Sequence, residues 1–321
     1  MLEKIMDALN FAFRQKEAVY RVGRIASKAF SNGFSFKKIA AIFIAFTEMF
    51  GSVLFDGGLT PLGQELNLDG YELVFCDEFD GDSLNTDLWA YRASGPRRGG
   101  YNAESQVEVK DGNLVFTGEY LEDGEYGPGW YVGMVNIKQK YKRGYFECRA
   151  IINSGDNFWS AFWIQADHPY DHDLSKGGVG GAEIDIFENV SSNANIFKRN
   201  SVTHTIHCNG GDDDAENLDS CTLGKFRGNN IYEEYNTYGL EWTEDEYIFY
   251  INGVETARSS WSKGVSEVEE MVIVSLEIPE KIEYETTSGH KTQFIVDYVK
   301  IWQKPADIQN SNLTVNSGEI L

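Results

Sequence analysis

Proline and basic residues are the scarce classes in this sequence. Its 321 residues include six prolines, and the 32 glycines follow no period, which excludes a collagen-like chain or a Pro/Gly-rich disordered chain. Lysine and arginine total 28 against 50 aspartates and glutamates, so the net charge is −22. A body of that sign repels phosphate backbones and argues against nucleic acid as a partner. A neutral polymer such as a polysaccharide is not repelled.

Cysteine is also rare, and its spacing supports no metal or redox motif. The four cysteines are Cys76, Cys148, Cys208 and Cys221, and none belongs to a Cys-x-x-Cys pair. Cys208 and Cys221 flank an acidic stretch and could close a loop disulfide there. The alternative is four ordinary thiols, and spacing alone leaves both readings open.

Basic residues gather at the N-terminus. Residues 1–40 carry eight Lys and Arg and three Asp and Glu, and apolar residues recur there at helical spacing. A 17-residue apolar run, 39–55, follows a lysine pair and resembles the apolar region of a signal peptide, although Glu48 interrupts it. We expect residues 1–60 to be a helical, signal-like or anchor-like extension that contacts a membrane. The protein is then secreted or anchored at the cell surface. The alternative is a pair of helices packed on the body.

From Tyr71 onward the pattern changes to short β-rich segments separated by turn signals. Hydrophobic residues make up 42 % of the chain and aromatics 14 %, which is enough for a large core. Asn252-Gly253 predicts a hairpin with a type I′ turn. These features predict an all-β jelly-roll sandwich over residues 65–304, followed by a loose tail at 305–321. The expected strands are 71–76, 112–118, 144–152, 158–165, 182–188, 203–208, 236–242, 247–251, 271–276 and 294–302.

Three carboxylates fall within six residues of one expected strand. Glu183 and Asp185 are two residues apart and share a face, whereas Glu188 lies on the opposite face by parity. One β-bulge between Asp185 and Glu188 would direct all three to the same side. Aligned carboxylates repel one another, so packing alone does not favour them on a largely apolar strand. The sequence therefore predicts an active site here rather than an exposed acidic face.

The segment Glu-Ile-Asp-Ile-Phe-Glu at 183–188 resembles the bulged catalytic signature of glycoside hydrolase family 16. Further blocks that resemble the family are Asp77-Glu78-Phe79, 111–114, 144–147, 159–163, 238–242 and 296–300, so the resemblance covers about residues 65–303. It implies a concave, concanavalin-like β-jelly roll with a glycan cleft across one sheet. The E-x-D-x-x-E branch that it resembles includes laminarinase-like and lichenase-like β-glucanases.

The resemblance also implies a retaining mechanism with two carboxyl groups ~5–5.5 Å apart. Glu183 would be the nucleophile and Glu188 the acid/base, while Asp185 between them could hydrogen-bond and tune Glu183. No cofactor is expected for this chemistry. The family often carries a structural calcium, for which Glu78, the Gly112 carbonyl and Asp297 would supply oxygens. Ordinary surface carboxylates are the alternative.

Sugar rings present apolar faces, so aromatic side chains are expected in the cleft. Trp159 and Trp163 share a strand face beside the carboxylates, and the family places tryptophans there; their alternative place is the core. His207 and Asn102 align with family residues that contact sugar, and Trp130 could line the rim.

One stretch departs from the β-1,3-glucanase pattern, at 274–279. We expect a monomeric endo-acting retaining enzyme on β-1,3- or mixed β-1,3/1,4-glucan. The alternatives are a galactan hydrolase acting on agar, porphyran or carrageenan, for which Arg97 and Arg98 leave room, and a transglycosylase. From another class, a non-catalytic carbohydrate-binding sandwich would not need the carboxylate triad.

Overall fold

The computed structural model describes residues 58–155, 157–167, 173–190, 200–208, 220–279 and 291–310. The expected helical extension therefore lies outside the described residues up to position 57, as does the tail from 311 onward. Within the described residues, no helix has the length and apolar character needed to cross a membrane. The tail was expected to be loose, and this is wrong for its first residues, because Pro305–Asn310 form the short helix α4.

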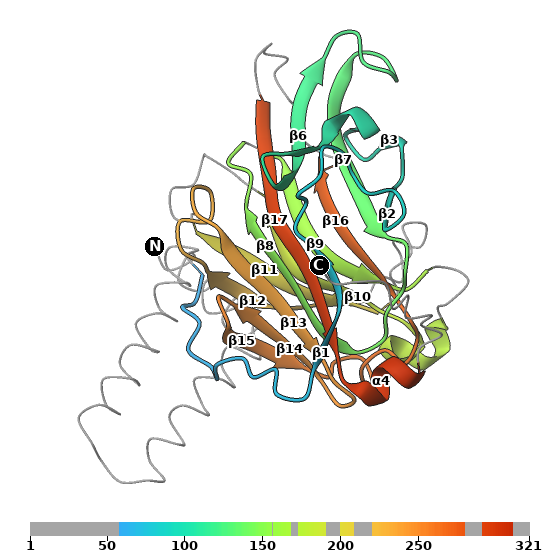
Figure 1. The fold of residues 1–321 in the computed structure, drawn as a ribbon, viewed down its shortest axis with the longest axis vertical. Helices are drawn as coiled ribbons and strands as arrows, with labels where there is room; N and C mark the ends of the chain where they lie inside the picture. Colours follow the sequence, from blue (N-terminus) through green and yellow to red (C-terminus); the bar gives the residue numbers. More distant parts are fainter. Residues whose placement is uncertain are drawn as a thin grey trace, which may run out of the picture.

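The described strands form one strongly curved sheet that doubles back into two layers, as Figure 1 shows. The pairing is antiparallel apart from β4 with β7. The order in the first layer is β12 (Ser220–Arg227), β11 (Ser201–His207), β10 (Glu183–Val190), β9 (Trp159–Gln165), β16 (Met271–Glu277), β7 (Gly129–Ile137) and β2 (Trp89–Tyr91).

The second layer packs on the first across the main core and shares β7 with it. Its order is β15 (Val254–Ser259), β14 (Tyr247–Ile251), β13 (Asn236–Trp242), β8 (Gly144–Ile151), β17 (Lys291–Gln303) and then both β6 (Asn113–Leu121) and β1 (Glu72–Asp77), with β5 (Val107–Lys110) on β6. The remaining elements are β3 (Gly95–Arg97), β4 (Gly100–Asn102) and the 3₁₀ segments η1 (Glu104–Gln106) and η2 (Leu174–Gly180).

Period-two patterning explains how β9 serves both the core and the outer face of the first layer. Phe162 and Ile164 point into the main core and are fully buried. The alternate residues Ala161 and Trp163 form a second apolar cluster with residues of β7 and β16. Burying a large apolar side chain stabilises the fold by ~1.5–3 kcal/mol, so both faces of this strand are energetically fixed.

Two sequence expectations can be checked directly in the second half of the chain. The Asn252-Gly253 turn has positive φ at both residues, 51° and 72°, as a type I′ hairpin requires, and it joins β14 to β15. Cys221 on β12 lies opposite Ile206 of β11, and the structure carries Cys208 and Cys221 as thiols rather than as a disulfide.

Residues 58–66 attach to the body through backbone hydrogen bonds. The Leu59 amide donates to the Lys225 carbonyl at 2.7 Å, and the Leu66 amide donates to the Gly253 carbonyl at 2.8 Å. This segment, which we call the N-terminal arm, is therefore part of the folded unit, although it precedes β1.

Candidate active site

The three carboxylates lie on one face of β10 because the strand is bulged. Glu183 pairs with Gln165 of β9, Asp185 with Trp163, and Glu188 with Ala161, so the register shifts by one residue between Asp185 and Glu188. The ladder with β11 shifts at the same place. The predicted bulge is therefore confirmed, and it brings Glu188 to the face that carries Glu183 and Asp185.

Burial and mutual repulsion control the protonation of this group. Asp185 is 2 % exposed, and it shares a hydrogen bond with Glu188. Burial, and after it the charge of Asp185, raises the pKa of Glu188 well above its usual range. Burial, and after it the charge of Glu183, also raises the pKa of Asp185. Glu188 consequently keeps a proton that it can donate near neutral pH.

His207 of β11 faces the first two carboxylates. Its Nε2 atom lies 3.1 Å from Asp185 Oδ2 and 3.9 Å from Glu183 Oε1. Glu183, Asp185 and His207 lie close enough together to bind a metal ion through one atom each. An ion bound there would coordinate both carboxylates. The sequence-predicted His207 is therefore in the group, in contact with Asp185; its contact with substrate stays a prediction.

Two polar residues that the sequence analysis missed support Glu183. Gln165 Nε2 donates to Glu183 Oε2 at 2.6 Å, and Arg92 donates to Gln165 Oε1 at 3.0 Å. Gln165 is two residues beyond Trp163 on the same strand, so strand parity could have placed it on the carboxylate face. Arg92 follows β2, in a part of the sequence without any motif. Together they orient one oxygen of Glu183.

An apolar floor lies beside the carboxylates. Its members come from β7, β9 and β16 and are Met134, Ala161, Trp163, Met271 and Ile273. Trp163 is 6 % exposed, and its indole N–H donates to Ser275 Oγ at 3.1 Å. Trp163 is therefore packed into the floor and held by β16, and its contact with substrate stays a prediction.

The far end of the same face carries two arginines. Arg97 Nε and Arg98 Nε both donate to Glu277 Oε2, at 2.8 and 3.0 Å. The Arg98 guanidinium also lies 5.0 Å from the ring centroid of Trp159, which is partly exposed. Glu277 belongs to the stretch that departs from the glucanase pattern, and its carboxylate is 5 % exposed. Glu277 thus holds Arg97 and Arg98 together at one end of the carboxylate face.

The other two residues predicted to contact sugar, Trp130 and Asn102, are both buried. Trp130 was expected on the rim, and this is wrong: it lies in the main core, with its ring edge-to-face against Phe158 and Tyr120. The reason is parity, since Trp130 shares the core-facing side of β7 with Val132. Asn102 is 2 % exposed on β4, and its amide nitrogen has no partner among the described residues. A sugar contact by Asn102 remains a prediction.

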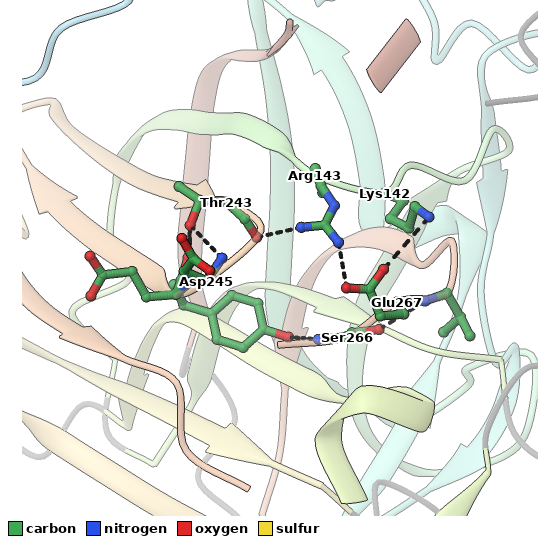
Figure 2. Close-up of polar contacts among 9 residues, drawn as sticks. Lys142, Arg143, Thr243, Asp245, Ser266 and Glu267 are labelled. Carbon is green, nitrogen blue, oxygen red and sulfur yellow. Dashed lines mark hydrogen bonds and ion pairs between the residues drawn. The ribbon is translucent and has the colours of Figure 1, made fainter. Parts of the chain in front are cut away.

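The loop between β15 and β16 holds the segment that leads into β10. Figure 2 shows Arg143 between the Thr243 carbonyl and the Glu267 carboxylate, which Lys142 also faces at 3.8 Å. In the same loop, the Glu267 amide donates to the Val179 carbonyl of η2 at 3.1 Å. The loop is therefore bonded on one side to the second layer and on the other to the segment that precedes β10.

Glu270 ends this loop and is buried. One of its oxygens accepts the amide hydrogen of Ala182, the residue before Glu183, at 2.9 Å. Its other oxygen has no partner among the described residues. Burial raises the pKa of Glu270 to about 8. It is a fourth carboxylate near the site, behind the strand rather than on its face.

The calcium ligands proposed from the sequence fit a cation poorly. Glu78 Oε1 lies 2.6 Å from Lys300 Nζ, and Asp297 Oδ2 lies 2.5 Å from Arg149 Nη1. Each carboxylate already faces a basic side chain, and both cations would have to move away before a metal ion could bind. Calcium at Glu78, Gly112 and Asp297 therefore stays a prediction.

A comparison with known protein families shows which family the chain belongs to. A sequence model described as "Beta-porphyranase A-D, GH16 domain" matches residues 73–304, which is most of the chain and includes all three carboxylates. The chain belongs to glycoside hydrolase family 16. The jelly-roll sandwich predicted from the sequence is accordingly the fold of this family 16 domain.

Curated relatives are about a quarter identical to the chain over the stretches that align. It is 28 % identical over 208 residues to a glucan endo-1,3-β-glucosidase A1 of Niallia circulans, covering 57 % of this chain and 29 % of that protein. It is 27 % identical over 135 residues to an endo-1,3-1,4-β-glycanase of Rhizobium meliloti, covering 42 % of this chain and 24 % of that protein. The chain thus matches less than a third of each relative's length.

Solved structures confirm the fold. A non-specific endo-β-1,3(4)-glucanase of family 16 superimposes with a TM-score of 0.61 at 21 % identity, covering 78 % of this chain and 97 % of that chain. The catalytic domain of a laminarinase from Thermotoga petrophila gives a TM-score of 0.58 at 18 % identity, covering 73 % of this chain and 98 % of that chain. At these identities the likeness concerns the fold alone.

Proposed function

We propose that this chain is a retaining endo-β-glycanase that hydrolyses β-1,3- or mixed β-1,3/1,4-glucan. The observation that carries the proposal is the bulge in β10, which places an acidic Glu188 with a raised pKa on the same face as Glu183. Two carboxyl groups with separate protonation states are what double displacement at a glycosidic bond requires.

In the proposed reaction, Glu188 donates its proton to the glycosidic oxygen while Glu183 attacks the anomeric carbon. The leaving sugar departs and a glycosyl ester of Glu183 forms. Glu188, now ionised, takes a proton from water, and the resulting nucleophile releases the sugar with retained configuration. Gln165 orients Glu183, and Asp185 holds Glu188 through their shared hydrogen bond.

The partly exposed Trp159 and the curated relatives support a glucan as substrate. Trp159 lies on the same strand as Trp163, and its ring can meet the apolar face of a sugar. The two relatives described above are named as acting on β-1,3 and β-1,3-1,4 linkages. A polysaccharide is too large to cross a cell membrane unaided, so the proposal includes a secreted or surface-anchored location.

A galactan substrate is the second candidate, and the arginine pair favours it. Arg97 and Arg98 both contact Glu277, so two guanidinium groups lie close together at that end of the site. Guanidinium groups are suited to binding the oxygens of a sulfated sugar. The family model that matches the chain is also that of β-porphyranases.

The test is a panel of laminarin, lichenan, agarose, porphyran and xyloglucan, with products sized by chromatography and the anomer of the first product followed by NMR. Oligosaccharides of the retained anomer from laminarin or lichenan support the first proposal. Cleavage of porphyran alone, lost in Arg98→Gln, establishes the second. Products longer than the substrate indicate transglycosylation. Binding without any product would show a carbohydrate-binding sandwich and overturn both.

A further inference from the structure

The bulge in β10 is opposed by a single residue of β11. Between the pairs Asp185–Thr205 and Glu188–Thr203, two residues of β10, Ile186 and Phe187, face His204 alone. In the ladder with β9, Ile186 also has no register partner. Ile186 therefore has no register partner on the β9 side and shares His204 with Phe187 on the β11 side, and its buried carbonyl group needs a hydrogen-bond donor.

His204 supplies that donor. Its ring is fully buried, and its Nδ1 atom lies 2.5 Å from the Ile186 carbonyl oxygen. A carbonyl oxygen can only accept, so Nδ1 carries the hydrogen of this bond. On the other side of the ring, Nε2 lies 3.0 Å from the Thr256 hydroxyl.

The ring is held in this orientation by aromatic packing. Its centroid lies 5.1 Å from that of Phe226 and 4.8 Å from that of Phe249. Burial lowers the pKa of His204 to about 4, so the ring is neutral near neutral pH. Neither the carboxylates nor the apolar floor includes His204, because strand parity turns it into the core.

We propose that His204 is a positioning residue for catalysis: its hydrogen bond to the Ile186 carbonyl holds the bulge that keeps Glu188 on the face of Glu183. The proposal rests on the proposed glycoside hydrolysis. Without the donor, β10 can recover ladder pairing only by slipping its register. A slip of one residue turns a side chain to the opposite face of the sheet. Glu188 would then point away from the glycosidic oxygen that it protonates.

The experiment compares two amide substitutions that differ in where they place a nitrogen. His204→Asn puts an N–H near the position of Nδ1, whereas His204→Gln puts its amide near the position of Nε2. Phe226→Leu is the matched control, because it loosens packing on the same ring and leaves the Nδ1 bond in place. Each protein is checked for folding by circular dichroism and melting temperature before kinetics are measured.

We expect His204→Gln to lower kcat by about 10²-fold with KM nearly unchanged, since displacing a reacting group by about 1 Å costs that much. His204→Asn should recover most of the loss, and Phe226→Leu should lower the melting temperature without changing kcat. The basic limb of the pH profile, which reports Glu188, should shift in His204→Gln alone.

A readout without turnover separates this proposal from the proposed function. The pKa of Glu188 can be followed by NMR with ¹³C-labelled carboxyl groups in the wild-type protein and in each variant. A displaced Glu188 titrates differently in His204→Gln even if no polysaccharide of the panel is cleaved. Equal Glu188 titration and equal kcat in His204→Gln and Phe226→Leu at matched stability would overturn the positioning role.

Discussion

Both layers of the sandwich bury carboxylates, but the groups that surround these carboxylates differ between the layers. In the second layer, Glu147 accepts hydrogen bonds from Tyr145 at 2.7 Å and from Tyr298 at 2.8 Å. Burial, and then the charge of Glu147, raises the pKa of both tyrosine hydroxyls, so they remain protonated donors. Each oxygen of Glu147 thus accepts a hydrogen bond from a neutral donor.

In the first layer, carboxylates lie beside one another. Asp185 and Glu188 share a hydrogen bond, and although His207 Nε2 lies 3.1 Å from Asp185, burial and then a neighbouring carboxylate raise the pKa of both groups. Glu270 interacts with the Ala182 amide and the Ser266 side chain, yet burial still raises its pKa to about 8. The comparison shows that burial that is not offset by donors or by opposite charge produces a carboxyl group that can exchange a proton.

The largest effect is expected where the proton is used. Glu188→Ala should lose ~10²–10⁴-fold in rate on polysaccharide, yet still attack substrates with good leaving groups, because these need little protonation. Added azide should give a glycosyl azide of retained configuration from Glu188→Ala and of inverted configuration from Glu183→Ala. The products are assigned by NMR. The opposite stereochemical pair would exchange the two roles.

A smaller effect on rate, with a shift in pH dependence, is expected for Asp185→Asn. The substitution removes the negative charge that raises the pKa of Glu188. Glu188 should then lose its proton at lower pH, and the basic limb of the kcat/KM profile should move to lower pH. The rate at the optimum should fall less than in Glu183→Ala or Glu188→Ala. An unmoved basic limb would contradict the coupling.

Glu270→Gln tests the carboxylate behind the strand. Because the pKa of Glu270 is raised in the folded state, the folded protein holds more protons than the unfolded chain between about pH 4.5 and 8. Wild-type stability should therefore fall across that window, by up to a few kcal/mol. Glu270→Gln should make this decline smaller, as measured by urea unfolding at pH 5 and 8, and the raised pKa values of Asp185 and Glu188 account for the part that remains. The same decline in both proteins would show that Glu270 is ionised in the fold.

Glu147→Gln is the counterpart in the second layer. Replacing a carboxylate that accepts from Tyr145 and Tyr298 should cost ~1–3 kcal/mol of stability. Activity at low temperature and the pH profile should stay as in the wild type. Tyr298→Phe is the control, since it removes one of the same two hydrogen bonds. A changed pH profile in Glu147→Gln would contradict the purely structural role of Glu147.

The smallest effect on catalysis is expected from truncation at the N-terminus. Removing residues 1–57 should leave kcat unchanged, because the carboxylate face is built from β9, β10 and β16. Removing residues 1–66 should instead lower the melting temperature, since the N-terminal arm bonds to Lys225 and Gly253. Loss of turnover in the folded 58–321 protein would show that the extension belongs to the active unit.

Most of the fold could be predicted because its longer strands carry clear period-two or apolar patterns. Both ends of each of the ten expected strands lie within three residues of an observed strand, and Asn236–Trp242 and Tyr247–Ile251 coincide with the expectation. The pattern failed for β7, whose glycines and unbroken apolar residues hide its alternation. It also failed for β12 and for the short strands β2 to β4, which depend on neighbours for their pairing.

By itself, the sequence determined the carboxylate triad, the need for a bulge between Asp185 and Glu188, and the two tryptophans of β9, because these follow from parity within a single strand. Only the tertiary structure decided which residues serve that strand from elsewhere. Gln165, Glu270 and His204 act through contacts across the sheet, and Trp130 lies in the core. The physical reason is that a pattern records which face a residue takes, whereas hydrogen bonds and pKa values depend on what the rest of the chain brings to that face.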